Sequence, residues 1–242
     1  MSANFTKVLD KYRKISFSEK DKGERFERLM KAYLLTDPLY SDRFKKVWLW
    51  SEFPGKNDLG GWDTGIDLVA LTHEGDYWAI QCKCYAENTF VDKKAVDSFL
   101  STSSRSFKNE NLQTTHFSQC LFISTSNKWS VNAEEALKNQ NPPVSRITLL
   151  HLKEAPVDWE KLDQNITGEL ARTEKKKLRP HQVTALQDTN KHFKENDRGK
   201  LIMACGTGKT FTSLRIAENE TQSKGFVLFL VPSIALLGQT LN

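Results

Sequence analysis

Residues 65–85 read GIDLVALTHEGDYWAIQCKCY and contain two apolar stretches joined by a short polar turn. Runs of apolar, β-branched and aromatic residues bounded by turn residues are typical of strands, so HEGD at 73–76 predicts a tight hairpin. Side chains alternate along a strand, which puts Ala79, Gln81 and Lys83 on one face of the second strand. Because the other face of this strand is apolar, the hairpin is expected to lie at the centre of a sheet.

The stretches around this hairpin alternate between helical and strand patterns. The expected elements, in chain order, are a helix at 19–35, a strand at 45–53, the hairpin, a helix at 92–104, a strand at 118–125, a helix at 131–140 and a strand at 145–152. The first helix is amphipathic, with Phe26, Met30 and Tyr33 on its apolar face. Helices and strands mixed in this order predict an α/β fold in which helices cover the faces of a sheet.

Length and composition limit the class of protein. The 242 residues are 38% hydrophobic and 27% charged, which is typical of a folded chain and excludes disorder as the dominant state. The net charge of +5 permits a nucleic-acid partner without requiring one. No apolar run of about 18 residues occurs and the N-terminus lacks a secretory signal, so no membrane contact is expected. The four cysteines suit reduced thiols in a cytoplasmic protein.

Three polar residues in the apolar hairpin point to hydrolysis of phosphodiesters. The turn sets Asp67 beside Gln81 and Lys83, and a lysine inside an apolar strand is costly without a negative partner. Phosphodiester hydrolysis needs a hard cation held by oxygen ligands. Asp67 would supply the charged ligand, the Gln81 side chain or the Cys82 carbonyl a neutral one, and Lys83 would hold the attacking water or stabilise charge. The alternative for Asp67 is a strand-end acid that faces solvent.

The helix at 19–35 offers a further acid. At 100° per residue, Glu27 flanks the apolar face near Met30, whereas Glu24 points outward. Glu27 is therefore the better candidate for a metal ligand. On spacing alone, an ordinary surface glutamate fits this position nearly as well.

The motifs Gly23-x-x-Phe26-Glu27, Asp63-x-Gly65-Ile66-Asp67 and Gln81-x-Lys83 resemble the Mrr-like branch of the PD-(D/E)xK nucleases. The resemblance covers about residues 19–155 of a domain at 1–155 and extends through Ser124-Thr125-Ser126. It implies a restriction-endonuclease-like mixed sheet flanked by helices and Mg²⁺-dependent cleavage of double-stranded DNA. The implied catalytic residues are Glu27, Asp67, Gln81 and Lys83, and the implied metal ligands are Asp67, Gln81, Glu27 and Cys82. Asp63, in a glycine-flanked turn, is expected to be structural.

Beyond the nuclease motifs the composition changes. Residues 156–178 are polar and end in a basic run, so a partly helical linker with solvated charges is expected. A helix then begins with Pro180 in its first turn. A strand at 199–205, a glycine loop, a helix from Lys209 and a strand at 226–232 predict a β-loop-α-β unit of a parallel nucleotide-binding sheet.

The glycine loop, Ala204-Cys205-Gly206-Thr207-Gly208-Lys209-Thr210, has the pattern of a phosphate-binding loop. Backbone amides around Gly206 and Gly208 would cradle the phosphates of ATP at the helix N-terminus. Lys209 would reach the β/γ oxygens and Thr210 would bind magnesium. The alternative is a glycine-rich turn that binds no nucleotide.

The same region resembles the superfamily 2 helicases. Arg179-Pro180-His181-Gln182 is similar to their Q motif, which implies that Gln182 reads adenine, and Val231-Pro232-Ser233 is similar to their motif Ia. The resemblance implies that residues 179–242 are an N-terminal fragment of a RecA-like lobe. Nuclease and motor in this order resemble the single-polypeptide type ISP restriction-modification enzymes. That resemblance implies downstream motor, methyltransferase and target-recognition regions as partners in the parent polypeptide.

The sequence therefore predicts a Mg²⁺-dependent DNA endonuclease domain of a restriction enzyme, fused to the start of an ATP-dependent DNA translocase. Two alternatives stay open: a DNA- or partner-docking module whose nuclease site has decayed, and the accessory N-domain of a repair helicase. The 242 residues hold no acidic Walker B pair after the glycine loop, so this chain by itself is expected to lack DNA-stimulated ATPase activity.

Overall fold

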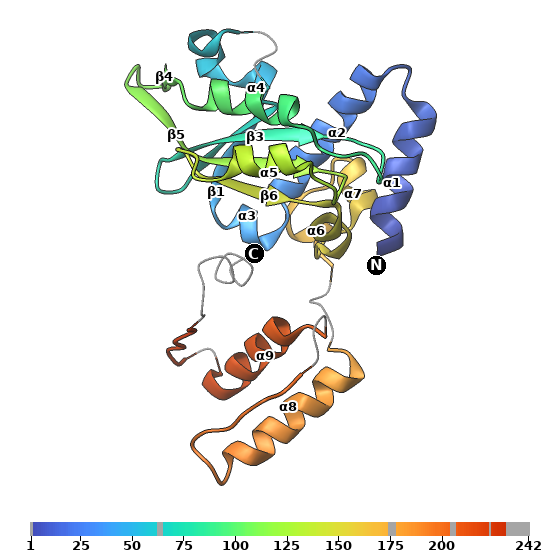
Figure 1. Cartoon of the computed structure of the whole chain (residues 1–242), viewed down its shortest axis with the longest axis vertical. Helices are drawn as coiled ribbons and strands as arrows, with labels where there is room; N and C mark the ends of the chain where they lie inside the picture. Colours follow the sequence, from blue (N-terminus) through green and yellow to red (C-terminus); the bar gives the residue numbers. More distant parts are fainter. Residues whose placement is uncertain (1, 62–64, 174–177, 204–206, 223, 231–242) are drawn as a thin grey trace. The chain divides into compact units, whose positions relative to one another are not determined.

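The computed structural model describes residues 2–61, 65–173, 178–203, 207–222 and 224–230. The chain forms two compact units, Met1–Glu174 and Lys175–Asn242 (Figure 1). Asp63, Gly206 and the motif at 231–233 lie outside the described residues. Among the described helices, none is long and apolar enough to cross a membrane.

The described residues of the first unit contain a six-stranded mixed sheet. The strands are β1 (Phe44–Leu49), β2 (Leu68–Thr72), β3 (Tyr77–Lys83), β4 (Ser106–Lys108), β5 (Thr114–Ser124) and β6 (Val144–Ile147). Strands β1, β2 and β3 are antiparallel neighbours, whereas β3 and β6 both run parallel to β5. The short β4 pairs antiparallel with the first residues of β5. The predicted hairpin, β2–β3, therefore lies inside the sheet.

Helices cover both faces of this sheet, as the α/β class predicts (Figure 1). The elements are α1 (Ser2–Ile15), α2 (Glu19–Leu34), α3 (Pro38–Ser41), α4 (Lys93–Ser103), α5 (Val131–Leu137), α6 (Leu149–Glu154) and α7 (Trp159–Asp163), with 3-10 turns at Trp50–Glu52, Pro54–Leu59 and Gly168–Ala171. Alternation along β3 divides the core between the two faces. Ile80 and Cys82 pack with α1, α2, α6 and α7, whereas Tyr77 and Ala79 pack with α4 and α5.

Helix α2 matches the helix predicted at 19–35. The side chain of Ser18 caps its first turn by accepting a hydrogen bond from Asp21 N at 3.1 Å. Phe26, Met30 and Leu34 recur at helical spacing and are fully buried. The helix therefore packs against the sheet beside β3 and holds its next polar position, at Glu27, close to that strand.

The strand predicted at 145–152 is wrong in its second half. Strand β6 ends at Ile147, and α6 begins at Leu149. Thr148 N donates to His151 Nδ1 at 3.0 Å, which closes the first turn of the helix. Leu149 and Leu152 are both buried, and their spacing of three places them on one helical face rather than on one strand face.

Most of the linker predicted at 156–178 belongs instead to the core of the first unit. Val157, Trp159, Leu162 and Ala171 are each at most 4% exposed. The Trp159 ring stacks on Tyr33, with the two centroids 5.2 Å apart, and its indole N–H donates to the Leu152 carbonyl. The segment is polar on average, but four of its apolar residues are placed so that they reach the core, whereas Ile166 and Leu170 stay exposed.

In the second unit, α8 (Pro180–Phe193) and α9 (Lys209–Thr221) match the two predicted helices. The flanking segments differ from the prediction, since residues 199–203 and 224–230 form no strand in the part of the unit that the structure describes. A strand exists only through hydrogen bonds to a neighbouring strand. Neither segment has such a neighbour among the described residues, so the β-loop-α-β pattern appears as helices joined by extended chain.

Candidate active site

Asp67 stands at the entrance to β2 and is bound to β3 by two hydrogen bonds. Its backbone N–H donates to the Ile80 carbonyl at 2.9 Å, and its Oδ2 accepts from Cys82 N at 2.7 Å. The register that pairs Leu68 with Ile80 puts Asp67 opposite Gln81. The carboxylate is thus held at the end of β3 where the predicted polar residues lie.

Gln81 is a buried polar residue whose side-chain oxygen is unsatisfied. Only 2% of the residue is exposed, and Oε1 has no hydrogen-bond partner among the described residues. An orphaned buried acceptor costs about 1–3 kcal/mol. Such a group next to a carboxylate therefore fits a ligand that binds oxygen atoms.

Glu27 joins the site from α2. The residue is half-buried, and burial raises the pKa of its carboxyl group to about 7, with the negative charges of Asp67 and Glu24 adding to the rise. The positive charges of Lys83 and Arg28 act in the opposite direction. The structure therefore brings Glu27, Asp67 and Lys83 within electrostatic reach of one another, and it exposes Glu24, as the helical spacing predicts.

Cys82 and Lys83, the last two residues of β3, can contribute different chemical groups to the site. Burial raises the pKa of the Cys82 thiol well above its usual value, and the charges of Asp67 and Glu27 raise it further. The thiol is therefore neutral, and Cys82 contributes backbone groups. Lys83 is half-buried, and its carbonyl accepts from Thr125 N at 3.1 Å, so its backbone is fixed by β5.

The Ser124-Thr125-Ser126 motif holds the loop that follows β3. Thr125 Oγ1 donates to the Tyr85 carbonyl at 2.7 Å, and Ser126 Oγ donates to the Thr89 carbonyl at 2.5 Å. All three motif residues are at most 1% exposed. The sequence marks this motif only as part of the family resemblance, whereas the structure shows a structural role at the rim of the site.

The donor set at this end of the sheet fits a hard divalent cation. The described residues contain no group of three or more His, Cys, Asp or Glu side chains arranged to hold a metal. The Asp67 and Glu27 carboxylates lie within electrostatic reach of each other, and the unsatisfied oxygen belongs to Gln81, the residue opposite Asp67. A cation here would draw its other ligands from amide and backbone oxygens, which suits magnesium or calcium and not a thiolate-bound metal.

The glycine loop of the second unit contacts the predicted Q motif. Gln182 is 4% exposed; its Oε1 accepts from Arg179 N at 2.9 Å and its Nε2 donates to the Thr207 carbonyl at 2.9 Å. Gly208 has a φ of +80° and caps α9. Its neighbours Lys209 and Thr210 are exposed on the first turn of that helix. The Gln182 amide, predicted to read adenine, thus binds the backbone of the glycine loop at Thr207 in this structure.

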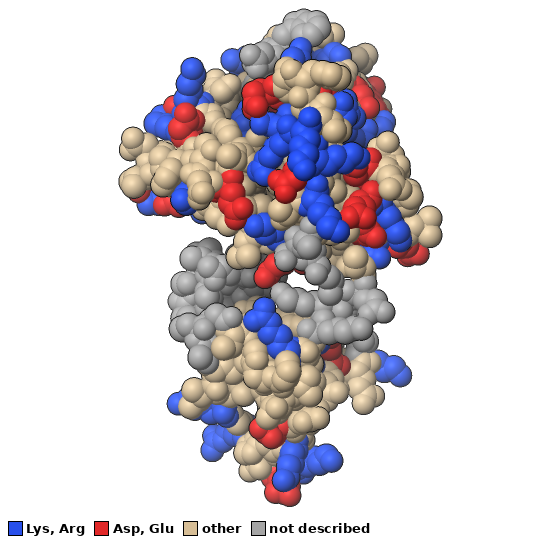
Figure 2. Space-filling view, turned by 90° about the vertical axis from the view of Figure 1, so that its right-hand side faces the viewer, with Lys and Arg blue, Asp and Glu red and all other residues tan. Residues whose placement is uncertain are grey.

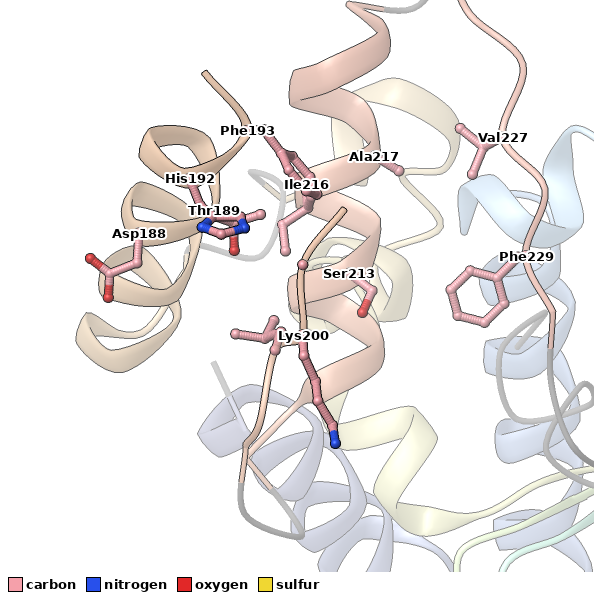
Figure 3. A pocket seen from close by; sticks show the side chains of 12 residues that line it. Asp188, Thr189, His192, Phe193, Lys200, Ser213, Ile216, Ala217, Val227 and Phe229 are labelled. Atoms are coloured by element: carbon pink, nitrogen blue, oxygen red, sulfur yellow. The ribbon is translucent and has the colours of Figure 1, made fainter. Parts of the chain in front are cut away.

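The second unit also contains a pocket of about 500 Å³, shown in Figure 3. Helices α8 and α9 and the two extended segments line it, through residues such as Thr189, Phe193, Ile216 and Phe229. None of the described residues predicted to bind nucleotide is among them. The pocket therefore has no part in the predicted phosphate site.

A mixed sheet flanked by helices, with an acid and a Gln-x-Lys pair at the ends of neighbouring strands, is the architecture of restriction-endonuclease-like proteins. A family model described as restriction endonuclease matches residues 35–169, more than half of the chain. The chain belongs to this restriction endonuclease family. A second model, described as the res subunit of type III restriction enzymes, matches residues 175–242. Asp67, Gln81 and Lys83 lie inside the first match, and Glu27 lies outside it.

Three solved structures resemble the chain. The "ATP-dependent Type ISP restriction-modification enzyme LlaBIII bound to DNA" is 38% identical, with a TM-score of 0.57, over 89% of this chain and 13% of that enzyme. The modification-dependent endonuclease AspBHI is 18% identical (68% of this chain, 38% of that one, TM-score 0.39), and MspJI in complex with an oligonucleotide is 17% identical (60% and 29%, TM-score 0.38). The chain thus spans about one-eighth of the length of LlaBIII. No curated protein sequence matches it.

Proposed function

We propose that the first unit hydrolyses phosphodiester bonds of double-stranded DNA with the help of Mg²⁺. The observation that carries the proposal is the buried, unsatisfied oxygen of Gln81 opposite the fixed carboxylate of Asp67. Membership of the restriction endonuclease family supports it. In this proposal Asp67 and Glu27 hold the cation, and Gln81 Oε1 and the Cys82 carbonyl complete its protein ligands.

Each residue then has a separate chemical task. The hydrogen bond from Cys82 N orients the Asp67 carboxylate before any substrate arrives. The ammonium group of Lys83 stabilises the negative charge that develops on the phosphate in the transition state and orients the attacking water. When bound, Mg²⁺ supplies a Lewis acid that polarises the phosphoryl oxygen and lowers the pKa of a water molecule.

The second unit is proposed to belong to an ATP-dependent DNA translocase. Its match to the family of type III restriction enzyme res subunits and the resemblance of the chain to a type ISP enzyme support this proposal. The polypeptide would then carry its methyltransferase and target-recognition regions elsewhere, and cleavage would depend on movement along DNA. The chain keeps Glu27, Asp67 and Lys83, which argues against the alternative of a docking module whose nuclease site has decayed.

The proposal is tested with the purified chain, supercoiled plasmid and a Mg²⁺ titration, with a chelator as one control and Asp67→Asn as another. We expect Mg²⁺-dependent nicking that the Asp67→Asn chain lacks. Calorimetric titration of Mg²⁺ into both proteins covers the case in which cutting needs the motor. The proposal fails if the chain neither nicks DNA nor shows Mg²⁺ binding that depends on Asp67.

A further inference from the structure

The turn between α1 and α2 concentrates positive charge beside the candidate active site. Residues 11–31 contain eight Lys and Arg against four Asp and Glu, a surplus of four in a chain whose net charge is +5. Figure 2 shows a continuous group of basic side chains on the face where α1 lies. The rest of the chain is nearly neutral by comparison.

Some of these charges are not used by the fold, whereas Lys11, Arg13 and Lys31 pair with Asp163, Asp10 and Glu52. The acids Glu19 and Asp21 pair with Lys22 and Arg25 of their own helix. Lys14 and Lys20 are exposed and form no ion pair or hydrogen bond within the described part of the chain. Surface lysines without partners add self-repulsion and no packing energy, so stability does not explain the cluster.

The helix hairpin that carries the basic surface packs next to β3. Helix α2 packs against β3, and α1 packs against α2. The α1–α2 hairpin therefore lies beside the strand that carries Gln81 and Lys83.

An exposed aromatic side chain stands at the turn itself. Phe17 is 96% exposed, although the position before a helix N-cap commonly packs against the following turn. Its backbone N–H donates to Asp21 Oδ2 at 3.1 Å, so the turn is ordered and presents the ring outward. An apolar ring flanked by cations suits contact with the sugars and base edges of a nucleic-acid groove.

We propose that the α1–α2 hairpin is a DNA-binding surface, on which Arg13, Lys14 and Lys20 contact the phosphate backbone of the duplex and Phe17 contacts its groove. Such contacts fix the position of the duplex without reading its sequence. This inference rests on the proposed nuclease function, because the surface would hold the strand that the site cuts. Charge complementarity selects duplex DNA as the occupant.

The test compares two triple variants of the whole chain, both in an Asp67→Asn background that prevents cleavage. The first is Arg13→Gln/Lys14→Gln/Lys20→Gln. The second, Lys45→Gln/Arg105→Gln/Lys108→Gln, removes the same charges from exposed positions. Lys45 lies near the start of β1, and Arg105 and Lys108 lie beside and at the end of β4. Both places are near the Tyr77 end of β3, at the opposite end of that strand from Lys83. Circular dichroism checks that both variants are folded.

Affinity for a fluorescent 30-base-pair duplex is measured by anisotropy over a range of salt concentrations. Each phosphate contact contributes about 0.9 to the slope of log K against log salt. We expect the first triple variant to reduce this slope by about 2 to 3 and to weaken binding at least tenfold at about 0.1 M salt. The control should change the slope by less than about 1. Phe17→Ala alone should weaken binding severalfold with an unchanged slope, because the ring carries no charge.

Equal losses of DNA affinity in the two triple variants would overturn the inference, because such losses would depend only on the net charge of the chain. Binding by the first triple variant equal to that of its parent would assign the surface to another partner and would also overturn it. So would a parent chain that fails to bind duplex at about 50 mM salt. The proposed nuclease function fails on a different readout, namely the lack of Mg²⁺-dependent nicking and Mg²⁺ binding by the unmodified chain.

Discussion

Oδ2 of Asp67 lies 2.7 Å from the backbone N of Cys82 and accepts its hydrogen bond. This side-chain bond extends the link between β2 and β3 beyond their last paired residues, which are Leu68 and Ile80. The proposed metal-binding carboxylate is therefore also part of the sheet. Substitutions at this position must separate the two roles.

Asp67→Asn and Asp67→Ala are predicted to have different effects on stability and the same effect on cleavage. Asparagine keeps an oxygen acceptor for Cys82 N, so the melting temperature of the Asp67→Asn chain should stay close to that of the unmodified chain. Alanine leaves this N–H without its partner and should cost about 1–3 kcal/mol. Both should slow cleavage by about two to three orders of magnitude or more, because a charged ligand is lost. Near-normal nicking by the folded asparagine variant would disprove the assignment of Asp67.

Lys83→Ala should stop cleavage and leave Mg²⁺ binding intact, because an ammonium group is not a ligand for a hard cation. Plasmid nicking and calorimetric Mg²⁺ titration give the two readouts, and circular dichroism gives a third. A variant that fails to fold would show instead that the lysine mainly neutralises Glu27 and Asp67 within the core. Lys128→Ala, at a more exposed position after β5, is the control.

Gln81→Glu is expected to tighten Mg²⁺ binding, since it replaces a neutral oxygen ligand with a charged one. Without metal, a third carboxylate near Glu27 and Asp67 should lower stability by about 1–2 kcal/mol, because like charges in a buried site repel. Added Mg²⁺ should restore the melting temperature. If Mg²⁺ had no larger effect on the melting temperature of the variant than on that of the unmodified chain, Gln81 would not belong to the metal site.

The raised pKa of Glu27 predicts that the stability of the metal-free chain depends on pH. Its folded-state pKa of about 7 lies above the unfolded value of about 4.5, so the folded protein holds this proton more tightly. The stability that the group contributes is therefore complete below about pH 4.5 and is lost as the pH rises through 7. With a chelator present, the free energy of unfolding of Glu27→Gln should be about 1–2 kcal/mol larger than that of the unmodified chain at pH 8, because solvent screens part of the effect. At pH 4.5 the two free energies should differ little.

The measurement for Glu27 is urea unfolding at several pH values, with Glu24→Gln as the matched control on the exposed side of the same helix. A stability difference between Glu27→Gln and the unmodified chain that does not change from pH 4.5 to 8 would contradict the prediction.

Gln182→Ala should loosen the glycine loop of the second unit. It removes the hydrogen bond to the Thr207 carbonyl and the acceptor for Arg179 N. Two hydrogen bonds of about 0.5–1.5 kcal/mol each correspond to amide exchange roughly 5 to 150 times faster at the first turns of α8 and α9. Gln187→Ala, at an exposed position on the same helix, should leave exchange there unchanged. Equal protection in both variants would show that Gln182 does not hold the loop.

Much of the first unit could be predicted from local patterns. The hairpin β2–β3, the buried face of α2 and the family motifs were all recognisable, because strand alternation and helical spacing act over a few neighbouring residues. The errors have the same origin. Leu149 and Leu152 suit a helix as well as a strand, and the predicted strand at 199–205 depends on neighbours that no local pattern describes.

By itself, the sequence determined the class of fold, the order of most elements and the residue types available for chemistry. Only the tertiary structure decided that Asp67 binds Cys82 N, that Gln81 is left with an unsatisfied oxygen and that Trp159 belongs to the core. It also decided that Glu27 and Lys83, 56 positions apart in the sequence, act on each other's charge. Contacts of this kind depend on how helices and strands pack across the whole unit, and packing is a property of the assembled core rather than of any short stretch of chain.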